Sequence, residues 1–154
     1  MNMRRSAVTL ALLLAGPLGA CAQEPAGDPP LAGARIGGAF SLTDQDGRTV
    51  TDRDFAGKYR IVYFGYTFCP DVCPTDVQNI AAALKLLERD DAALAQRIVP
   101  IFITVDPARD TPAALKRFVS AFHPRLVGLT GTPEQIAKVA KEFGIYYARG
   151  AGTA

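Results

Sequence analysis

Residues 60–74 read RIVYFGYTFCPDVCP, a stretch that joins the pattern of a buried strand to the start of a helix. Residues 60–65 are mostly β-branched or aromatic, which predicts a strand buried on both faces. From Pro74 onward, apolar side chains recur at helical spacing, which predicts a helix of about four turns. Cys69 and Cys73 are therefore expected in the turn between a strand and a helix N-terminus.

The remainder of the domain alternates strands with helices. An Asp46-Gly47 turn between two short apolar stretches predicts an opening hairpin. Threonine followed by proline marks the start of two later helices, the second with a capping-box Gln135. This alternation predicts an α/β fold with a mainly parallel sheet covered by helices. The later predicted elements are strands at 98–105, 126–129 and 145–147 and helices opened by Thr111-Pro112 and Thr132-Pro133.

Residues 1–20 have the pattern of an export signal, with two arginines, an apolar run and small residues before Cys21. The apolar run is about twelve residues, whereas a helix that crosses a bilayer needs about 20. Leu18-Gly19-Ala20-Cys21 resembles the lipobox of bacterial lipoproteins, which implies that Cys21 is lipidated. We therefore expect export to the periplasmic side of a bacterial membrane and a lipid anchor. A plain signal peptide is the alternative, which keeps export and loses the anchor.

Residues 21–38 are rich in alanine, glycine and proline, which predicts a flexible tether before a folded domain at 39–154. Without Arg4 and Arg5, the 17 Lys and Arg residues become 15 and balance the 15 Asp and Glu residues. No basic face with interleaved aromatic residues is evident, so nucleic acid is not an expected partner.

The chemistry of the domain is expected at Cys69 and Cys73, the two thiols that remain if Cys21 is lipidated. Unpaired amides and the helix dipole favour thiolate at a helix N-terminus, which predicts a lowered pKa for at least Cys73. Three residues separate the cysteines, a spacing that permits a disulfide and also lets both sulfurs face one ion. Paired thiolates suit Cu(I) and other soft or borderline metals.

Three segments in this order resemble the Sco (SenC) family of copper-binding proteins: residues 65–74, 105–111 and 128–132. The resemblance runs from about Phe40 to Tyr147. It implies a thioredoxin-like fold in which Cys69 and Cys73 bind copper together with one histidine. It also implies a metallochaperone that supplies copper, or reduces cysteines, for assembly of the cytochrome c oxidase copper centre. The implied partners are a cytochrome c oxidase subunit or another periplasmic copper or thiol protein.

We expect no residue of this sequence to take the place of the histidine ligand. The family places it well after the segment that matches Tyr146-Tyr147, and this chain stops at Ala154. The one histidine, His123, is expected to face solvent near a helix C-terminus and not to bind metal. We therefore expect Cu(I) to be retained and Cu(II) binding to be impaired. We also expect an incomplete C-terminal end, as in a truncated family member.

Two other functions fit the same cysteines. An exported thiol–disulfide oxidoreductase would use Cys69 and Cys73 through a mixed disulfide, and it would be an enzyme, whereas a copper carrier need not be one. A static Cys69–Cys73 disulfide in an inert domain is the third alternative, although so short a loop adds little chain-entropy stabilisation.

The polar and aromatic residues near the cysteines leave further alternatives open. Asp71 lies between the thiols and is expected to be a solvated turn carboxylate. Asp106 is a candidate for supporting the cysteines without binding the metal itself. Helix capping and loop hydrogen bonding explain Asp106 and Asp110 equally well. Four aromatic residues are expected in the core and the pocket wall: Tyr63, Phe64, Tyr66 and Phe68.

Overall fold

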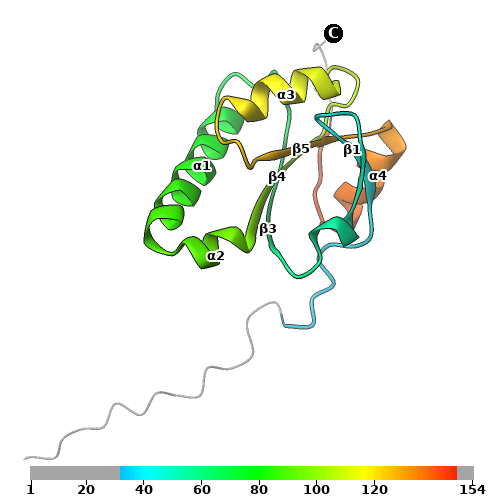
Figure 1. The fold of residues 1–154 in the computed structure, drawn as a ribbon. Helices are drawn as coiled ribbons and strands as arrows, with labels where there is room; N and C mark the ends of the chain where they lie inside the picture. The colour runs from blue at the N-terminus through cyan, green and yellow to red at the C-terminus, as the bar shows by residue number, and fades with distance from the viewer. Residues whose placement is uncertain (1–31, 149–154) are drawn as a thin grey trace, which may run out of the picture. The chain divides into compact units, whose positions relative to one another are not determined.

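The computed structural model describes residues 32–148 (Figure 1). The expected export signal, the expected lipidation site Cys21 and most of the expected tether lie outside the described residues, as do residues 149–154. The described part carries five strands and four α-helices. The α/β class predicted from the sequence is confirmed.

The strands form one sheet in the order β2-β1-β5-β4-β3. Strands β3, β4 and β5 run parallel, with Gly65 opposite Thr104 and Ile103 opposite Leu129. Strand β1 runs antiparallel to β5 and to β2, so the predicted hairpin is also confirmed. The strands are β1 (Ser41–Asp44), β2 (Thr49–Thr51), β3 (Tyr59–Gly65), β4 (Ile98–Thr104) and β5 (Val127–Thr130).

Strand β3 lies at one edge of the sheet formed by the described residues. Its first half is exposed, with Tyr59 at 56% and Ile61 at 39% of full exposure. The prediction of a strand buried on both faces was therefore wrong for this half. A short β-branched and aromatic run is compatible with an edge strand as well as a central one, because both need a pleated, half-buried surface. Only the second half, toward Gly65, turns into the core.

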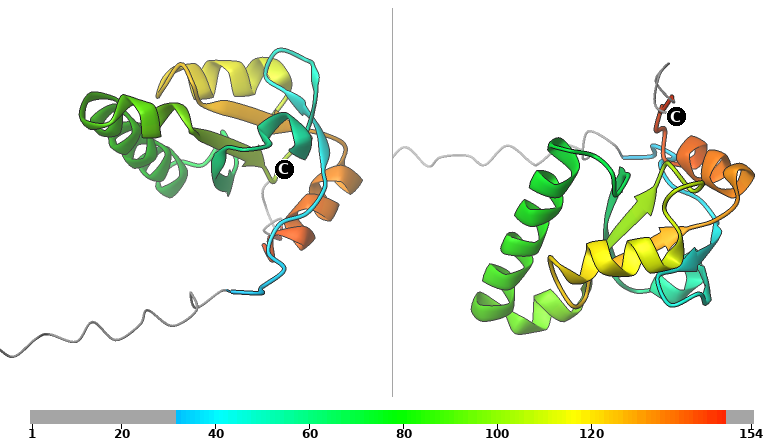
Figure 2. Two further views of the ribbon diagram at one scale, coloured as in Figure 1. Left: turned by 60° about the horizontal axis from the view of Figure 1, so that its bottom comes forward. Right: turned by 90° about the horizontal axis from the view of Figure 1, so that it is seen from above.

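The helices cover both faces of the sheet (Figures 1 and 2). Buried hydrophobic residues form two clusters, and successive side chains of β4 belong to different ones. Phe102 packs in one cluster with Val77 and Leu115. Ile101 and Ile103 face the other way, in the cluster that contains Ile136 of α4. The helices are α1 (Val72–Asp90), α2 (Ala92–Gln96), α3 (Pro112–Ser120) and α4 (Pro133–Glu142), with a short 3₁₀ helix, η1, at Asp52–Phe55.

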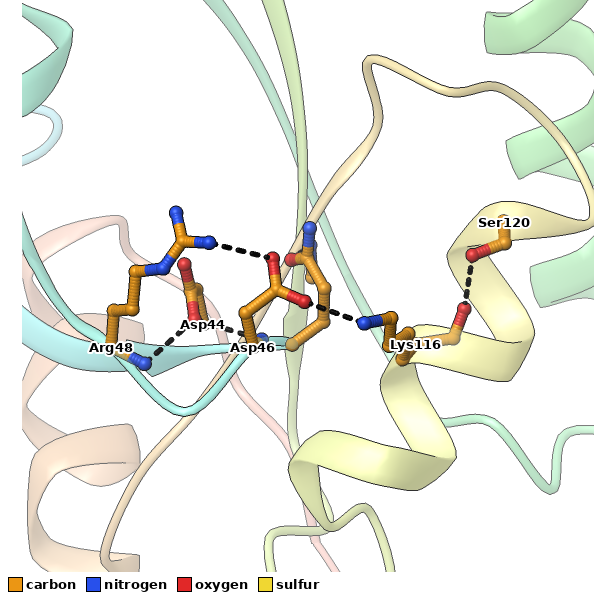
Figure 3. Close-up of polar contacts among 7 residues, drawn as sticks. Asp44, Asp46, Arg48, Lys116 and Ser120 are labelled. Atoms are coloured by element: carbon orange, nitrogen blue, oxygen red, sulfur yellow. Dashed lines mark hydrogen bonds and ion pairs between the residues drawn. The ribbon is translucent and has the colours of Figure 1, made fainter.

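The β1–β2 turn is held by its own carboxylates (Figure 3). Asp44 Oδ1 accepts hydrogen bonds from the backbone N–H groups of Asp46 and Arg48, each at 2.8 Å. Gly47 takes a positive φ of 80°, which the predicted turn requires. Asp46 reaches Lys116 of α3 at 2.8 Å, so the hairpin is also tied to the helix layer.

Helices α3 and α4 begin where the sequence predicts, α1 begins earlier than predicted, and the short helix α2 was not predicted. Helix α1 begins at Val72, two residues before Pro74, so Cys73 lies in its first turn. The capping box of Thr132 and Gln135 is present. Residues 145–147 form no strand in the described structure, and Tyr146 is 92% exposed. Between residues 32 and 148, no helix combines the length and apolar character needed to span a membrane.

Candidate functional site

The chain turns from the carboxyl end of β3 into α1 (Figure 1). Cys69 lies in this turn, and Cys73 is the second residue of α1. The turn is closed by a hydrogen bond from the N–H of Cys69 to the carbonyl oxygen of Tyr66, at 3.2 Å. The N–H of Cys73 donates to Sγ of Cys69, with 3.4 Å between nitrogen and sulfur. Both residues are free thiols in this structure. The strand-to-helix placement predicted for the pair is thus present.

The two sulfurs have different surroundings. Cys73 is 4% exposed, whereas Cys69 is only half-buried. Burial raises the pKa of Cys73, and its hydrogen bond to Cys69 raises that pKa further. The prediction of a lowered pKa for Cys73 was therefore wrong. Cys73 lies in the first turn of α1 with its side chain in the core. There, the loss of solvent destabilises the thiolate more than the helix N-terminus stabilises it.

Cys69 is the sulfur whose pKa is lowered. Burial acts to raise the pKa of Cys69, but nearby hydrogen-bond donors that favour the thiolate outweigh it. The donors are the thiol of Cys73, the backbone N–H groups of Asp71 and Cys73, and the hydroxyl of Tyr66. The helix N-terminus thus stabilises a thiolate as expected, but on the residue that precedes the helix.

Tyr63 and Asp76 flank the buried sulfur. The Tyr63 hydroxyl donates to Oδ2 of Asp76 at 3.0 Å, and Asp76 lies three residues after Cys73 in α1. Burial raises the pKa of Tyr63, and its hydrogen bonds to Asp76 and Cys73 raise it further. A Cβ atom at Gly65 would lie 3.1 Å from Sγ of Cys73 and 2.9 Å from the Tyr63 ring. Because glycine has no Cβ, the Cys73 sulfur and the Tyr63 ring can pack directly against the backbone of residue 65.

The loop after β4 packs against the cysteine turn. Asp110 is fully buried and its carboxylate accepts both the backbone N–H and the hydroxyl of Thr67, at 2.9 and 2.6 Å. Asp106 is paired with Arg109, whose guanidinium lies 5.1 Å from the centre of the Phe68 ring. Loop hydrogen bonding, one of the two explanations given for these aspartates, is therefore present.

The SCO1/SenC family model matches residues 28–153, which is most of the chain. The chain belongs to the SCO1/SenC family. It is 50% identical over 116 residues to protein SenC of Rhodobacter capsulatus, a match that covers 75% of this chain and 51% of that protein. It is 46% identical over 119 residues to the mitochondrial SCO1 homolog 1 of Arabidopsis thaliana, covering 77% of this chain and 35% of that protein. The chain therefore spans about half or less of these relatives' length.

The same family likeness appears among solved structures. Bradyrhizobium japonicum ScoI with copper bound is 45% identical and matches with a TM-score of 0.71, over 77% of this chain and 73% of that one. The predicted mixed α/β, thioredoxin-like fold is confirmed by this match.

His123 does not complete the site of this SCO1/SenC chain. It is 3% exposed, so the expectation of a solvent-facing side chain was wrong. Its Nε2 lies 3.4 Å from Glu88 near the end of α1, and its Nδ1 accepts the N–H of Arg125. Glu88 is 15 positions beyond Cys73 on the same helix, about 22 Å along the axis at 1.5 Å per residue. In residues 32–148, no group of three or more metal-ligating side chains gathers at one point.

Three other residues lie near the cysteines of the SCO1/SenC chain: Asp71, Phe68 and Asp76. Asp71 is exposed, as expected, and contributes its backbone N–H to Cys69. Phe68 is 59% exposed, so its assignment to the core or pocket wall was wrong; its ring rests beside Arg109 at the surface. Asp76 was missed, although its position one helical turn after Cys73 places both on one face of α1.

Proposed function

We propose that this chain binds one copper ion between Cys69 and Cys73 and supplies it for assembly of the cytochrome c oxidase copper centre. The observation that carries the proposal is the pair of free thiols one helical turn apart, linked by the 3.4 Å hydrogen bond from Cys73 N–H to Cys69 Sγ. Two cysteine sulfurs on one strand-to-helix turn form a soft donor set, which suits Cu(I). The copper-bound structure of the similar Bradyrhizobium protein supports the same assignment.

The proposed cargo is Cu(I) in preference to Cu(II). A Cu(II) site favours a nitrogen ligand in addition to thiolates. The sole histidine in the sequence, His123, is buried against Glu88 at the other end of α1. The two sulfurs are therefore the ligands that this chain's described residues offer, and they favour the softer ion.

The cargo is proposed to enter and leave at Cys69. A ligand of the acceptor protein has to come within bonding distance of the sulfurs, and Cys69 is the more accessible of the two. Its lowered pKa keeps the thiolate available for metal exchange. Export and a lipid anchor on Cys21 would place the domain beside a membrane-bound acceptor.

Cu(I) titration of the purified chain against a competing Cu(I) chelator tests the proposal. One Cu(I) per chain is expected, with tight binding lost in Cys69→Ser and in Cys73→Ser, each of which keeps a single sulfur ligand. Cys21→Ser is the matched control, since it replaces the cysteine outside the proposed site, whether free or lipidated, and should leave the stoichiometry unchanged. Retention of tight one-to-one binding in either of the first two variants contradicts the proposal.

A thiol–disulfide oxidoreductase is the second candidate, favoured by the unequal thiols. Cys69 has the lowered pKa and the exposure of an attacking thiolate, and the buried Cys73 is placed to resolve a mixed disulfide. Steady turnover of a model disulfide, with Cys73→Ser trapping a mixed disulfide on Cys69, would favour this function. Negligible exchange together with stoichiometric Cu(I) binding favours the copper carrier.

A further inference from the structure

Asp110 is a fully buried carboxylate that ties together three segments at the carboxyl ends of β3 and β4. Its Oδ2 accepts the backbone N–H of Thr67 at 2.9 Å and the hydroxyl of Thr104 at 2.6 Å. Its Oδ1 accepts the hydroxyl of Thr67 at 2.6 Å. A buried carboxylate is tolerated only with such partners, and charge-assisted hydrogen bonds are stronger than neutral ones. The tie to Thr67 is therefore a firm one.

Thr67 is two residues before Cys69, at the start of the turn that carries this sulfur. Within the turn, Cys69 N–H donates to the carbonyl of Tyr66 and Cys73 N–H donates to Sγ of Cys69, and neither bond fixes the backbone of Tyr66 and Thr67 to the rest of the fold. Cys73 is held differently, because it lies within the first turn of α1. The two sulfurs are thus positioned by separate elements, and the spacing between them depends on what anchors the Cys69 turn.

The loop that carries Asp110 is itself ordered. The N–H of Asp106 donates to the hydroxyl of Thr104 at 2.9 Å, so this hydroxyl links Asp106 to Asp110. Arg109, paired with Asp106, extends its guanidinium over the ring of Phe68. The same loop therefore contacts residues on both sides of the Thr67–Phe68 peptide bond, from a sequence distance of about 40 residues.

We propose that Asp110 is a positioning residue for the dithiol: through Thr67 it holds Cys69 at the distance from Cys73 at which the pair closes on one ion or forms a disulfide. Both products need the sulfurs to be held near each other. Without the contact to Asp110, the Cys69 turn has more conformational freedom, which is lost when either product forms. The equilibrium constants for copper binding and for disulfide formation should therefore both fall. The copper part of this inference rests on the proposed function, and the disulfide part does not.

The test is the thiol–disulfide equilibrium of the purified chain with glutathione, in a Cys21→Ser background. In this reaction the chain's disulfide takes two electrons and two protons from two glutathione thiols, which leaves the Cys69–Cys73 dithiol and one glutathione disulfide. Asp110→Asn is expected to lower the constant for forming the protein disulfide about tenfold, about 30 mV for a two-electron couple. Thr67→Val is expected to shift it in the same direction, and Thr67→Ser, which keeps the hydroxyl, to restore the wild-type value.

Asp44→Asn is the matched control. Asp44 is also a buried carboxylate that accepts two backbone N–H groups, but it lies in the β1–β2 turn (Figure 3). We expect this variant to lose stability without changing the disulfide equilibrium. A shift equal to that of Asp110→Asn would mean that any loss of stability moves the equilibrium, and would overturn the proposal.

The remaining outcomes are also decisive. If Asp110→Asn is folded and its constant lies within twofold of wild type, the proposal is wrong. If Asp110→Asn does not fold, Thr67→Val decides, because it removes one contact and leaves the Asp110 bond to the Thr67 N–H. Cu(I) affinity should fall in parallel with the disulfide constant. A chain that binds no Cu(I), but whose disulfide constant responds as described, would refute the proposed function and support the positioning role.

Discussion

The N–H of Cys73 donates a hydrogen bond to Sγ of Cys69, and this contact makes two chemically similar thiols unequal. The amide belongs to the first turn of α1, so its free N–H and the helix dipole act on the sulfur before the helix. The sulfur inside the helix is turned into the core and loses solvent. One strand-to-helix turn thereby produces an accessible thiolate beside a protected thiol.

Thiol labelling of the reduced, metal-free chain should report this inequality. The lowered pKa of Cys69 and the raised pKa of Cys73 mean that, as pH rises, Cys69 becomes thiolate first. In a Cys21→Ser background, iodoacetamide should therefore modify Cys69 at lower pH than an ordinary thiol, and Cys73 later and more slowly. Peptide mass spectrometry measures both rates. Cys73→Ala removes a donor to the Cys69 thiolate and should shift the Cys69 profile to higher pH; faster labelling of Cys73 than of Cys69 would contradict the structure.

Gly65→Ala should damage both stability and the site. The new Cβ would lie 2.9 Å from the Tyr63 ring and 3.1 Å from Sγ of Cys73. Overpacking of this kind costs about 1–3 kcal/mol of unfolding free energy, measurable by urea titration. The displaced sulfur should also weaken Cu(I) binding.

Gly128→Ala is the control for this change. Its Cβ would lie 3.0 Å from Val119 and 3.3 Å from Leu115, which is a similar crowding against α3. This variant should lose stability while it keeps wild-type Cu(I) affinity in the folded chain. Equal losses of affinity in the two glycine variants would mean that crowding acts through the fold as a whole.

His123→Ala should destabilise the domain and leave copper binding intact. The variant removes the acceptor for the Arg125 N–H and the contact to Glu88. A backbone donor left without its partner costs about 1–3 kcal/mol, and urea unfolding should show a loss of this order. Cu(I) affinity, measured below the unfolding transition, should equal that of wild type. A substantial loss of affinity would show that His123 is a ligand after all.

The order of the five strands and of α1, α3 and α4 could be predicted because these elements have local signals, whereas the short α2 and η1 were not predicted. Threonine-proline caps open α3 and α4, and a glycine with positive φ shapes the hairpin turn. Burial was harder to predict, since it depends on which strands become neighbours. Tyr59 and Ile61 have strand-forming side chains wherever the strand lies, and only the sheet order shows that they lie at an edge.

The sequence predicts the pair of cysteines, but not the contacts and the burial that surround them. Cys69 and Cys73 are adjacent through their spacing on one turn, which sequence reveals. Asp110 reaches Thr67 across 43 positions, and His123 reaches Glu88 across the fold, so neither contact has a local pattern. The reversed order of the two thiol pKa values has the same origin, because burial of Cys73 depends on the packing of α1 against the sheet.

X-ray absorption spectroscopy at the copper edge measures directly whether both sulfurs bind the ion. The sample is the Cys21→Ser chain loaded with one equivalent of Cu(I), so that Cys69 and Cys73 are its only thiols. The expected spectrum shows a copper ion with two sulfur neighbours, and one sulfur fewer in Cys69→Ser. A copper shell made of nitrogen and oxygen alone, or one that keeps both sulfurs when Cys69 is replaced, would contradict copper binding between Cys69 and Cys73.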